Sequence, residues 1–436
     1  MEIAPFKGIR FSPENVGDLG LAICPPYDII GPAEQRLYYE RSNYNVVRLE
    51  CPTEGANSGH DRYQVAASIF RQWLSEGILK VDDLSSFYLH EHRFAHLGEM
   101  KIRRGLIARV KLEPWGKGIY PHEETSSWFK SDRLNLLRAC QANFSPLLAL
   151  YQDCKQKIVS VLSQVSQGKP LVEISVPSSG EEITQSKDGE VHILWAITDP
   201  RIQQELIELF ASQILYIADG HHRYESALVY YQEELQGGLS GYGTGSRAIG
   251  YVMMELVEFS DPGLVILPIH RVVRGLPPSV LARLPHELEK FFSLEIFPWE
   301  AQNFRLPPGG ILGIWGLLPN SLVVLRTRKD AFIGSFMPVP RSRVYREFNV
   351  SILNHVILEN MLKCNNTAEV AYTVDVEQAC EGVNQGIYQL AFLLSAPSVE
   401  LVKAIAQVHD RMPPKSTYFY PKVPAGLVIN PLNELS

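Results

Sequence analysis

Residues 216–228, YIADGHHRYESAL, contain an apolar run that ends in an acid, a glycine, two histidines and an arginine. If a helix starts at this point, Asp219 or Gly220 caps it and the three residues HHR occupy its first turn. Backbone N–H groups lack helical partners there and the helix dipole is positive, so cationic side chains are unfavourable for stability alone. A bound anion removes this conflict, and we therefore predict a phosphate-binding turn. Its predicted binding residues are Gly220, His221, His222 and Arg223.

A metal ion and a purely structural turn are the alternatives at this position. Adjacent helical residues point about 100° apart, so His221 and His222 do not readily share one zinc ion. Magnesium needs few carboxylates and keeps waters, which makes Asp219 together with the phosphates of a substrate the easier metal site. In the structural alternative the turn only joins a strand to a helix with a buried stripe, namely Tyr224, Ala227, Leu228, Tyr231 and Leu235.

The loop YPHEETSSWFKSDR, residues 120–133, is a second group of polar side chains. Glu123 is predicted to be a general base and His122 a phosphate or acid partner, with Asp132 and Arg133 as substrate contacts. The loop lacks the second histidine of H-E-x-x-H, which excludes the helix of the zinc proteases. An ordinary solvated loop before an Asp-capped helix is the alternative.

Two further stretches offer hydrogen-bond donors beside prolines. MPPKSTYFYPK, residues 412–422, is predicted to present Lys415, Ser416 and Thr417 to a phosphate, although no G-x-x-x-x-G precedes it as in a Walker loop. A proline-bounded surface turn is the alternative. CPPYD and LPIHR are weaker candidates for substrate contacts, with turn or packing roles preferred. Their residues are Tyr27, Asp28, His270 and Arg271.

Apolar runs and helical periodicities indicate which elements position these residues. Two apolar runs are typical of buried strands, and each is followed by a helical pattern. They are LYIADG, followed by HHRYESALVYYQEEL, and EVHILWAITDP, followed by RIQQELIELFAS. FYLHEHRFA and RRGLIARVKL alternate like two antiparallel strands. We expect a mixed α+β fold of several sheets with helices. A chain of 436 residues favours two or three units, which we place at 1–85, 86–275 and 276–436.

Composition excludes several classes of protein. The net charge of −7 argues against a protein that coats DNA or anionic lipid. Six scattered cysteines indicate neither a disulfide framework nor a cysteine-based zinc site. No leader pattern or uninterrupted run of about 18 apolar residues is present, so we expect a cytoplasmic protein without membrane partners. The oligomeric state is left open, a homodimer included.

Several stretches together resemble the signature segments of the bacterial and archaeal domain-of-unknown-function ten-fifteen family. They are CPPYDII, HEET followed by DR, LYIADGHHRYESAL, LPIHR and MPPKSTYFYPKVPAGL. The resemblance covers nearly the whole chain and implies no activity.

The stretch DGHHR also resembles the G-x-H-R turn of the ParB and sulfiredoxin superfamily, which grips nucleotide phosphates. This resemblance implies a central ParB/sulfiredoxin-like core in which Gly220, His222 and Arg223 bind phosphate and Asp219 assists. No cysteine lies beside the turn, so the redox chemistry of sulfiredoxin is not implied. The superfamily includes a kinase of free serine.

The leading hypothesis is a magnesium-dependent phosphotransferase that uses a nucleotide (ATP, ADP or CTP) and phosphorylates a small hydroxyl metabolite. His222 and Arg223 hold phosphate, Asp219 helps the metal, and Glu123 or Asp28 takes the acceptor's proton. A non-enzymatic sensor of a nucleotide or phospho-metabolite is the main alternative. A ParB-like nucleic-acid protein or nuclease is a further one and needs a basic face that the net charge does not favour.

Overall fold

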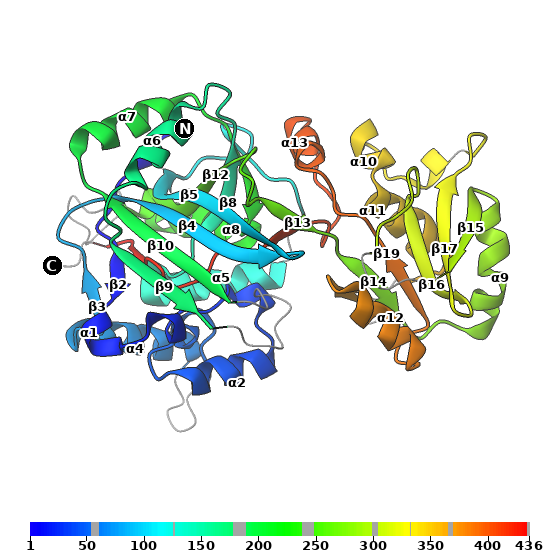
Figure 1. Ribbon diagram of the computed structural model, residues 1–436, viewed down its shortest axis with the longest axis horizontal. Helices are drawn as coiled ribbons and strands as arrows, with labels where there is room; N and C mark the ends of the chain where they lie inside the picture. Colours follow the sequence, from blue (N-terminus) through cyan, green and yellow to red (C-terminus); the bar gives the residue numbers. More distant parts are fainter. Residues whose placement is uncertain are drawn as a thin grey trace. The chain divides into compact units, whose positions relative to one another are not determined.

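The computed structural model of the protein describes residues 1–53, 61–124, 127–177, 189–237, 248–298, 304–331, 333–364 and 369–433, without the side chains of 127–130. The chain forms two compact units. Unit 1 comprises Met1–Pro121, Thr125–Val265 and Pro421–Ser436, and unit 2 comprises His122–Glu124 and Ile266–Tyr420. Both combine β-sheets with helices, which confirms the predicted α+β class (Figure 1).

The division into units differs from the three segments predicted from the sequence. The first predicted boundary, after residue 85, falls inside unit 1, and the second, after residue 275, falls inside unit 2. Strand pairing explains the first difference, because the N-terminal strands β1 (Ile3–Ala4) and β2 (Ile9–Phe11) pair with β5 (Glu99–Lys111) and β3 (Leu79–Val81). The N-terminal segment is thereby part of the same unit as the central strands.

A nine-stranded mixed sheet forms the centre of unit 1. Its order is β6-β11-β8-β12-β5-β4-β10-β9, with β1 added beside β5. β11 is parallel to β6, and β12 is parallel to β8, whereas the other pairs are antiparallel. The remaining strands are β4 (Phe87–His96), β6 (Ile119–Tyr120), β8 (Leu147–Tyr151), β9 (Val172–Val176), β10 (Glu190–Ile197), β11 (Leu215–Asp219) and β12 (Tyr251–Glu258).

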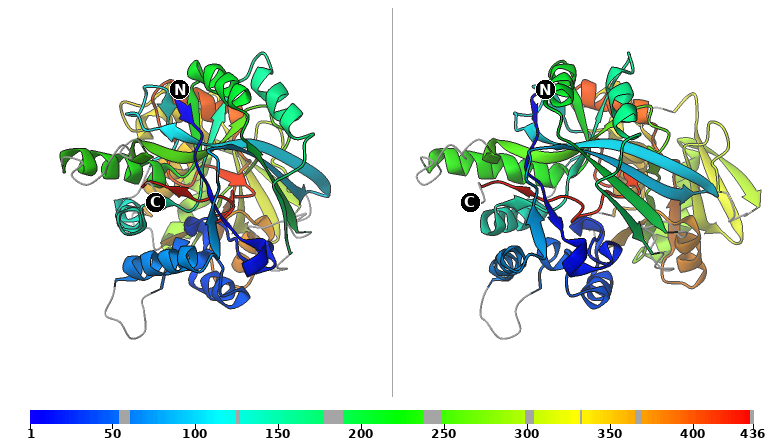
Figure 2. Two further views of the ribbon diagram at one scale, coloured as in Figure 1. Left: turned by 90° about the vertical axis from the view of Figure 1, so that its left-hand side faces the viewer. Right: turned by 60° about the vertical axis from the view of Figure 1, so that its left-hand side comes forward.

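The two faces of this sheet belong to different cores because side chains alternate along a strand. Phe87 and Leu89 of β4 join the large core, which α6, α7 and α8 also line, whereas Tyr88 joins a second core with Ile23 and Leu427. In both views of Figure 2, α7 and α4 lie on opposite sides of the sheet. The helices of unit 1 are α1 (Pro13–Val16), α2 (Pro32–Arg41), α3 (Val47–Glu50), α4 (Arg62–Ser75), α5 (Ser127–Cys140), α6 (Lys157–Val165), α7 (Pro200–Ala211) and α8 (His221–Gln236).

The strand-to-helix steps predicted from the sequence are present. β10 leads to α7, where the Asp199 side chain accepts a hydrogen bond from the backbone N–H of Arg201 and Pro200 occupies the first turn. Asp is a favourable N-cap and Pro is tolerated at the first helical position, so this helix starts where both residues place it. β11 leads to α8 in the same way, through Gly220.

Unit 2 is built on a six-stranded sheet of order β15-β17-β16-β19-β14-β18, in which neighbouring strands are antiparallel. Its strands are β14 (His270–Val273), β15 (Phe292–Pro298), β16 (Leu312–Leu318), β17 (Ser321–Thr327), β18 (Val370–Thr373) and β19 (Leu390–Leu393). Its helices are α9 (Pro278–Glu289), α10 (Arg343–Glu347), α11 (Asn349–Ile352), the π-helical segment Leu353–Met361, α12 (Val376–Asn384) and α13 (Val399–Gln407).

Short elements complete the fold. The strand pair β7 (Ala142–Asn143) and β21 (Asn430–Pro431) belongs to unit 1, and β13 (Val265–Leu267) pairs with β20 (Tyr418–Tyr420). Across the described parts of the chain, no helix has both the length and the apolar character required to cross a membrane.

We predict that Leu256→Ala lowers the free energy of unfolding by about 2–5 kcal/mol, because Leu256 is fully buried on β12 between two neighbouring strands. Leu84→Ala is the control, since Leu84 is 61% exposed and its truncation should change stability by less than about 0.5 kcal/mol. Urea titrations followed by far-UV circular dichroism measure both. Equal effects of the two substitutions would contradict the packing described for the sheet.

Candidate active site

The turn between β11 and α8 has the geometry that the sequence predicted. β11 ends at Asp219, α8 begins at His221, and Gly220 between them has φ +91°. A Cβ atom at Gly220 would lie 2.9 Å from Nη2 of Arg223 and 2.9 Å from Cγ of Leu147. The position therefore requires glycine, both for its backbone conformation and for the close approach of the Arg223 side chain.

Asp219 lies between two cationic side chains. Nη2 of Arg223 donates to Oδ2 of Asp219 at 2.8 Å, and Nζ of Lys422 donates to Oδ1. The side chains of Lys422, Arg223 and Asp219 are 7%, 9% and 14% exposed. Burial acts to raise the pKa of Asp219, but the charges of Lys422 and Arg223 outweigh it and hold that pKa below its ordinary value. Asp219 is thus an anion that fixes two cations.

Because Arg223 pairs with Asp219, the arginine in the first turn of α8 already has an anionic partner within the chain. Both carboxylate oxygens of Asp219 accept hydrogen bonds from cationic groups, so a magnesium ion at Asp219 would be repelled by the charges of Lys422 and Arg223. His221, which is buried, adds a further electrostatic contribution that lowers the pKa of Asp219. His222 lies in the same helical turn, and its carbonyl oxygen accepts a hydrogen bond from Oγ of Ser226.

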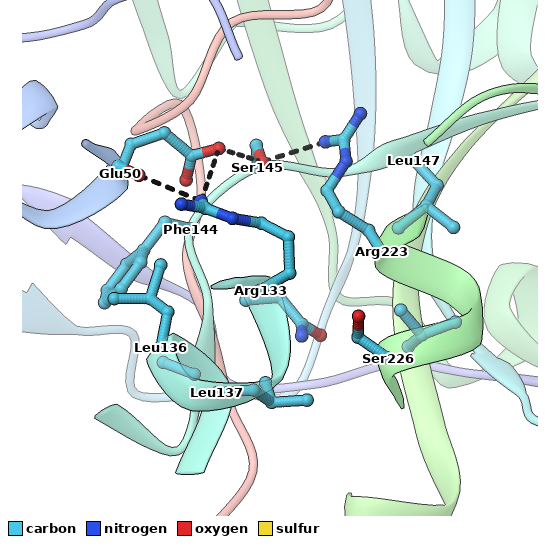
Figure 3. A pocket seen from close by; sticks show the side chains of 12 residues that line it. Glu50, Arg133, Leu136, Leu137, Phe144, Ser145, Leu147, Arg223 and Ser226 are labelled. Carbon is cyan, nitrogen blue, oxygen red and sulfur yellow. Dashed lines mark hydrogen bonds and ion pairs between the residues drawn. The ribbon is translucent and has the colours of Figure 1, made fainter. Parts of the chain in front are cut away.

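Arg223 continues into a chain of hydrogen bonds that ends at a second arginine. Its Nη1 donates to Oγ of Ser145 at 2.8 Å and to the carbonyl oxygen of Pro146 at 2.9 Å. Oγ of Ser145 donates to Oε1 of Glu50 at 3.0 Å, and Nη1 of Arg133 donates to the Glu50 carbonyl oxygen at 2.9 Å. Figure 3 shows this series, with Glu50 and Ser145 between the two guanidinium groups.

A small hollow of about 40 Å³ lies beside these residues. Glu50, Arg133, Ser145 and Arg223 form its polar part, and leucine side chains of α5 and β8 line the rest (Figure 3). One water needs roughly 10–15 Å³ by the same kind of measure, so the hollow accommodates a group of a few heavy atoms. It suits a phosphoryl group and is too small for a nucleoside.

The predicted residues of the CPPYD stretch lie in the same site. The Arg133 guanidinium carbon is 3.9 Å from the centre of the Tyr27 ring, a cation–π contact. Burial raises the pKa of Tyr27 well above its ordinary value, so Tyr27 stays neutral. Asp28 follows on the same turn, acts electrostatically on Lys422, and has a buried Oδ1 without a hydrogen-bond partner among the described residues. A buried carboxylate oxygen in this state is a candidate to receive a proton or a cation.

Asp132 and Arg133, the predicted substrate contacts on α5, are tied to each other and to α4. Nε of Arg133 donates to Oδ2 of Asp132 at 2.7 Å. Oδ1 of Asp132 accepts hydrogen bonds from Nη2 of Arg62 at 2.5 Å and from the Tyr63 hydroxyl at 2.9 Å. Asp132 therefore positions Arg133 and has no oxygen left for a ligand unless one of these contacts breaks.

The other predicted group is assembled within unit 2. His122 is fully buried, and its Nε2 is 2.9 Å from Oγ1 of Thr417. The carboxylate of Glu123 accepts hydrogen bonds from the backbone N–H groups of Lys415 at 3.0 Å and Ser416 at 3.3 Å. Lys415 has φ +61°, and successive N–H groups in such a turn form a concave anion site. The anion that this site holds is Glu123, so the predicted base and the predicted phosphate loop bind each other.

Arg271 and His270 belong to the same group but are buried. Nη2 of Arg271 donates to the Lys415 carbonyl oxygen at 2.8 Å, and burial lowers the pKa of Arg271 to about 10. Nδ1 of His270 accepts a hydrogen bond from the Leu394 backbone N–H, and burial lowers the pKa of His270 to about 4. The two residues hold the loop and strand ends of unit 2 in place.

The structure thus assigns the predicted residues to two separate units. Unit 1 holds Tyr27, Asp28, Asp132, Arg133, Asp219, Gly220, His221, His222 and Arg223. Unit 2 holds His122, Glu123, His270, Arg271, Lys415, Ser416 and Thr417. The sequence analysis missed Glu50, Ser145 and Lys422 as members of the first group. Only the excess of cationic residues in the DGHHR turn signalled that a buried anionic partner was needed, and it did not signal which residues complete the site.

In chemical terms, the first group is a set of donors for an anion. Arg223 and Lys422 converge on one carboxylate beside the start of α8, and Arg133 lies at the other end of the hydrogen-bond series. A phosphate oxygen has the same charge and acceptor geometry as a carboxylate oxygen, so it can share or replace the contacts to Asp219.

Comparisons with known proteins give a family and distant structural likenesses. A family model described as "Protein of unknown function (DUF1015)" matches residues 3–343. A search of curated proteins finds no match.

Solved structures resemble the chain at low scores. A conserved hypothetical protein from Pyrococcus furiosus is 14% identical, with 73% of this chain and 93% of that chain covered and a TM-score of 0.34. A free serine kinase in complex with AMP is 14% identical, with 73% and 88% covered and a TM-score of 0.34. SbnI from Staphylococcus aureus, truncated at its C-terminus, is 11% identical, with 72% and 82% covered and a TM-score of 0.32. At these scores the likenesses assign neither a fold nor an activity to this chain.

We predict that Lys422→Met lowers the free energy of unfolding at pH 7 by about 3 kcal/mol, because it removes one of the two cations that compensate a buried carboxylate. Lys415→Met is the matched control, since Lys415 is exposed and the change should stay within about 0.5 kcal/mol. Denaturant titration of the full chain measures both. Equal stability of Lys422→Met and the unmodified chain would show that the Asp219 pair does not contribute.

The same pair predicts a pH dependence. The pKa of Asp219 in the folded chain lies below its value of about 3.9 in an unfolded chain. The stabilisation is therefore complete above pH ~4 and is lost as the pH falls towards the folded pKa. The difference in stability between the unmodified chain and Lys422→Met should shrink between pH 7 and pH 3. A difference that does not change over this range would contradict the ionic pairing.

Proposed function

The chain belongs to the DUF1015 family, a membership that names no activity, and from the geometry of its own residues we propose that it transfers a phosphoryl group from a nucleotide to a hydroxyl group of a small metabolite. The observation that carries the proposal is the convergence of Arg223 and Lys422 on one buried carboxylate at the start of α8, with Arg223 also lining a phosphoryl-sized hollow. We include in the proposal that β11, Gly220 and α8 are a ParB/sulfiredoxin-like phosphate turn.

The roles of the cationic residues follow from the charge that phosphoryl transfer develops. The transferring group spreads negative charge over its oxygens, so catalysis consists mainly of positioning and of stabilising that charge. Arg223 and Lys422 bind phosphate oxygens in the proposal, and the backbone N–H groups of the first turn of α8 add uncharged donors. Asp219 holds both cations in place before the nucleotide binds, and Arg223 also lines the hollow.

Asp28 is the proposed proton acceptor. Within the described part of the chain, its Oδ1 is buried and has no hydrogen-bond partner, whereas both oxygens of Asp219 are in ion pairs. In unit 2, Glu123 accepts hydrogen bonds from two backbone N–H groups, which favours Asp28 over Glu123 as the base. The proton of the attacking hydroxyl passes to Asp28 as the new oxygen–phosphorus bond forms and the nucleotide's oxygen leaves.

Magnesium fits this site through Asp28 more readily than through Asp219. The ion prefers one or two carboxylates and completes its coordination with phosphates and water. When bound, it would neutralise charge on the nucleotide phosphates. Asp28 would hold the ion through the carboxylate oxygen that does not take the proton, whereas at Asp219 the ion would lie against the charges of Lys422 and Arg223.

A protein that binds a phosphorylated ligand without turning it over is the second candidate. The observation that favours it is that Asp132, Asp219 and Glu123 all have internal donors, which leaves few groups for proton transfer. Incubation of the pure chain with ATP, ADP or CTP, magnesium and a pool of hydroxyl metabolites, followed by mass spectrometry, separates the two. A product heavier than its precursor by one phosphoryl group supports the enzyme. A nucleotide that raises the melting temperature without any product supports the binding protein.

We predict that Asp28→Asn lowers the turnover number by about 10²–10⁴-fold and leaves nucleotide affinity nearly unchanged, because the amide keeps the size of the side chain but cannot take a proton. Glu123→Gln is the matched control and should retain turnover. If Glu123→Gln is the slow variant and Asp28→Asn is not, Glu123 is the base and our assignment is wrong.

We also predict that Arg223→Lys weakens nucleotide binding by about 1.5–3 kcal/mol, since lysine keeps the charge but cannot contact Asp219, Ser145 and a phosphate at once. Calorimetric titration with the nucleotide measures the affinity, and a thermal melt checks that the variant is folded. Unchanged affinity in a folded Arg223→Lys chain counts against the phosphate site.

A further inference from the structure

Three histidines and two glutamates are buried together on one face of the large sheet in unit 1. His90 and His92 lie on β4, Glu190 and His192 on β10, and Glu255 on β12. All five residues are at most 6% exposed. Buried ionisable groups require partners, and so many of them in a sheet face that otherwise forms an apolar core need an explanation.

Strand register brings the imidazoles together. His92 is directly opposite His192 in the β4–β10 pair, and their ring centres are 4.2 Å apart. His90 precedes His92 by two residues and therefore faces the same side of the sheet. Gly105 is opposite His90 on β5, and a Cβ atom there would lie 2.4 Å from the Glu255 side chain. The glycine thus leaves the space that Glu255 occupies.

Three of these residues present their donor atoms as a metal site does. One ligand atom each from His92, Glu190 and His192 lies within 4.8 Å of the other two. Nε2 of His92 is 2.7 Å and Nε2 of His192 is 3.8 Å from Oε2 of Glu190. In a tetrahedral zinc site with bonds of about 2.0–2.2 Å, ligand atoms are about 3.3–3.6 Å apart. The observed spacings lie on both sides of that value, so small side-chain rotations suffice.

A series of hydrogen bonds orients His192 towards the same point. Oε2 of Glu255 is 3.1 Å from Nδ1 of His90, and Nε2 of His90 is 3.1 Å from Nδ1 of His192. If Glu255 accepts the proton of His90 and His90 accepts that of His192, Nε2 of His192 carries a lone pair. Metal-binding histidines are held by such outer carboxylate partners, which fix the tautomer.

A buried guanidinium lies beside the same residues. Nη1 of Arg103 donates to the Pro421 carbonyl oxygen at 2.9 Å, and its Nη2 lies 3.2 Å from Nδ1 of His92.

From these contacts we propose that His92, Glu190 and His192 bind a divalent transition-metal ion of the zinc class, with His90 and Glu255 as outer partners of His192. Two imidazoles and one carboxylate are a ligand set that zinc accepts, and three protein ligands leave a fourth position for water. A hollow of about 10 Å³, enough for about one water, is lined by Glu190, His192 and Lys422. The ion ties β4 to β10. Binding changes one contact, because His92 then carries a proton on Nδ1 and no longer accepts a hydrogen bond from Arg103 there.

The test uses the full chain stripped of metal by a chelator. Zn²⁺ is titrated in competition with a chromophoric chelator, Co²⁺ reports the coordination geometry through its visible absorption, and a thermal melt is recorded with and without Zn²⁺. We expect one equivalent of Zn²⁺ per chain, a tetrahedral Co²⁺ spectrum and a higher melting temperature with Zn²⁺.

Substitutions locate the site. His192→Gln and Glu190→Gln should weaken Zn²⁺ binding at least about 100-fold, and His90→Gln about 10–100-fold through loss of the outer partner. His96→Gln, at the end of the same strand β4, is the matched control and should bind as the unmodified chain does. Equal affinity in all four variants, or substoichiometric Zn²⁺ in the unmodified chain, overturns the proposal. If a variant does not fold, the unmodified chain decides: a melting temperature that Zn²⁺ does not raise also overturns it.

Discussion

A carboxylate buried in a protein needs compensating positive charge, and in this chain Asp219 has two cations for one anion. Arg223 reaches it from the first turn of α8, and Lys422 reaches it from a segment that lies 203 residues further along the chain. The pair thereby joins the end of β11, the start of α8 and the C-terminal segment of unit 1. The same ion pair requires glycine at position 220, because a Cβ atom there would leave no room for the Arg223 guanidinium. The proposed phosphate site depends on the excess of positive charge around Asp219. Two cations contact one carboxylate, so a second anion can bind to them.

Local patterns were sufficient to predict the elements of the site. The apolar run before Asp219, the glycine after it and the helical stripe of α8 depend on neighbouring residues, and the strand, turn and helix are found as expected. The cationic first turn was correctly identified as a local conflict. The residues of the chain that satisfy this cationic turn were not predicted. Lys422, Ser145 and Glu50 reach it through long-range packing, which cannot be inferred from the spacing of residues in the sequence. Long-range pairing also bears on the predicted units, since β1 pairs with β5 although several helices and strands separate them in the sequence.

The motifs of the loop 120–133 illustrate how one stretch of sequence can serve two units. His122–Glu124 belongs to unit 2, whereas Asp132 and Arg133 on α5 belong to unit 1. Glu123 fills the anion-binding turn at Lys415 and Ser416 with its own carboxylate, so a loop with the donors for phosphate is already satisfied. The buried histidines of β4 and β10 went unrecognised because alternating residues were taken as ordinary strand pattern. Histidines two residues apart in a strand face one side, and this spacing was the available signal.

The most direct measurement is a structure of the full chain with a nucleotide and Mg²⁺ bound. Our interpretation predicts phosphate oxygens within hydrogen-bond distance of Arg223, Lys422 and the backbone N–H groups that follow Gly220, with Asp28 beside the terminal phosphate. A nucleotide bound away from α8, with Arg223 and Lys422 both still held by Asp219, would contradict it.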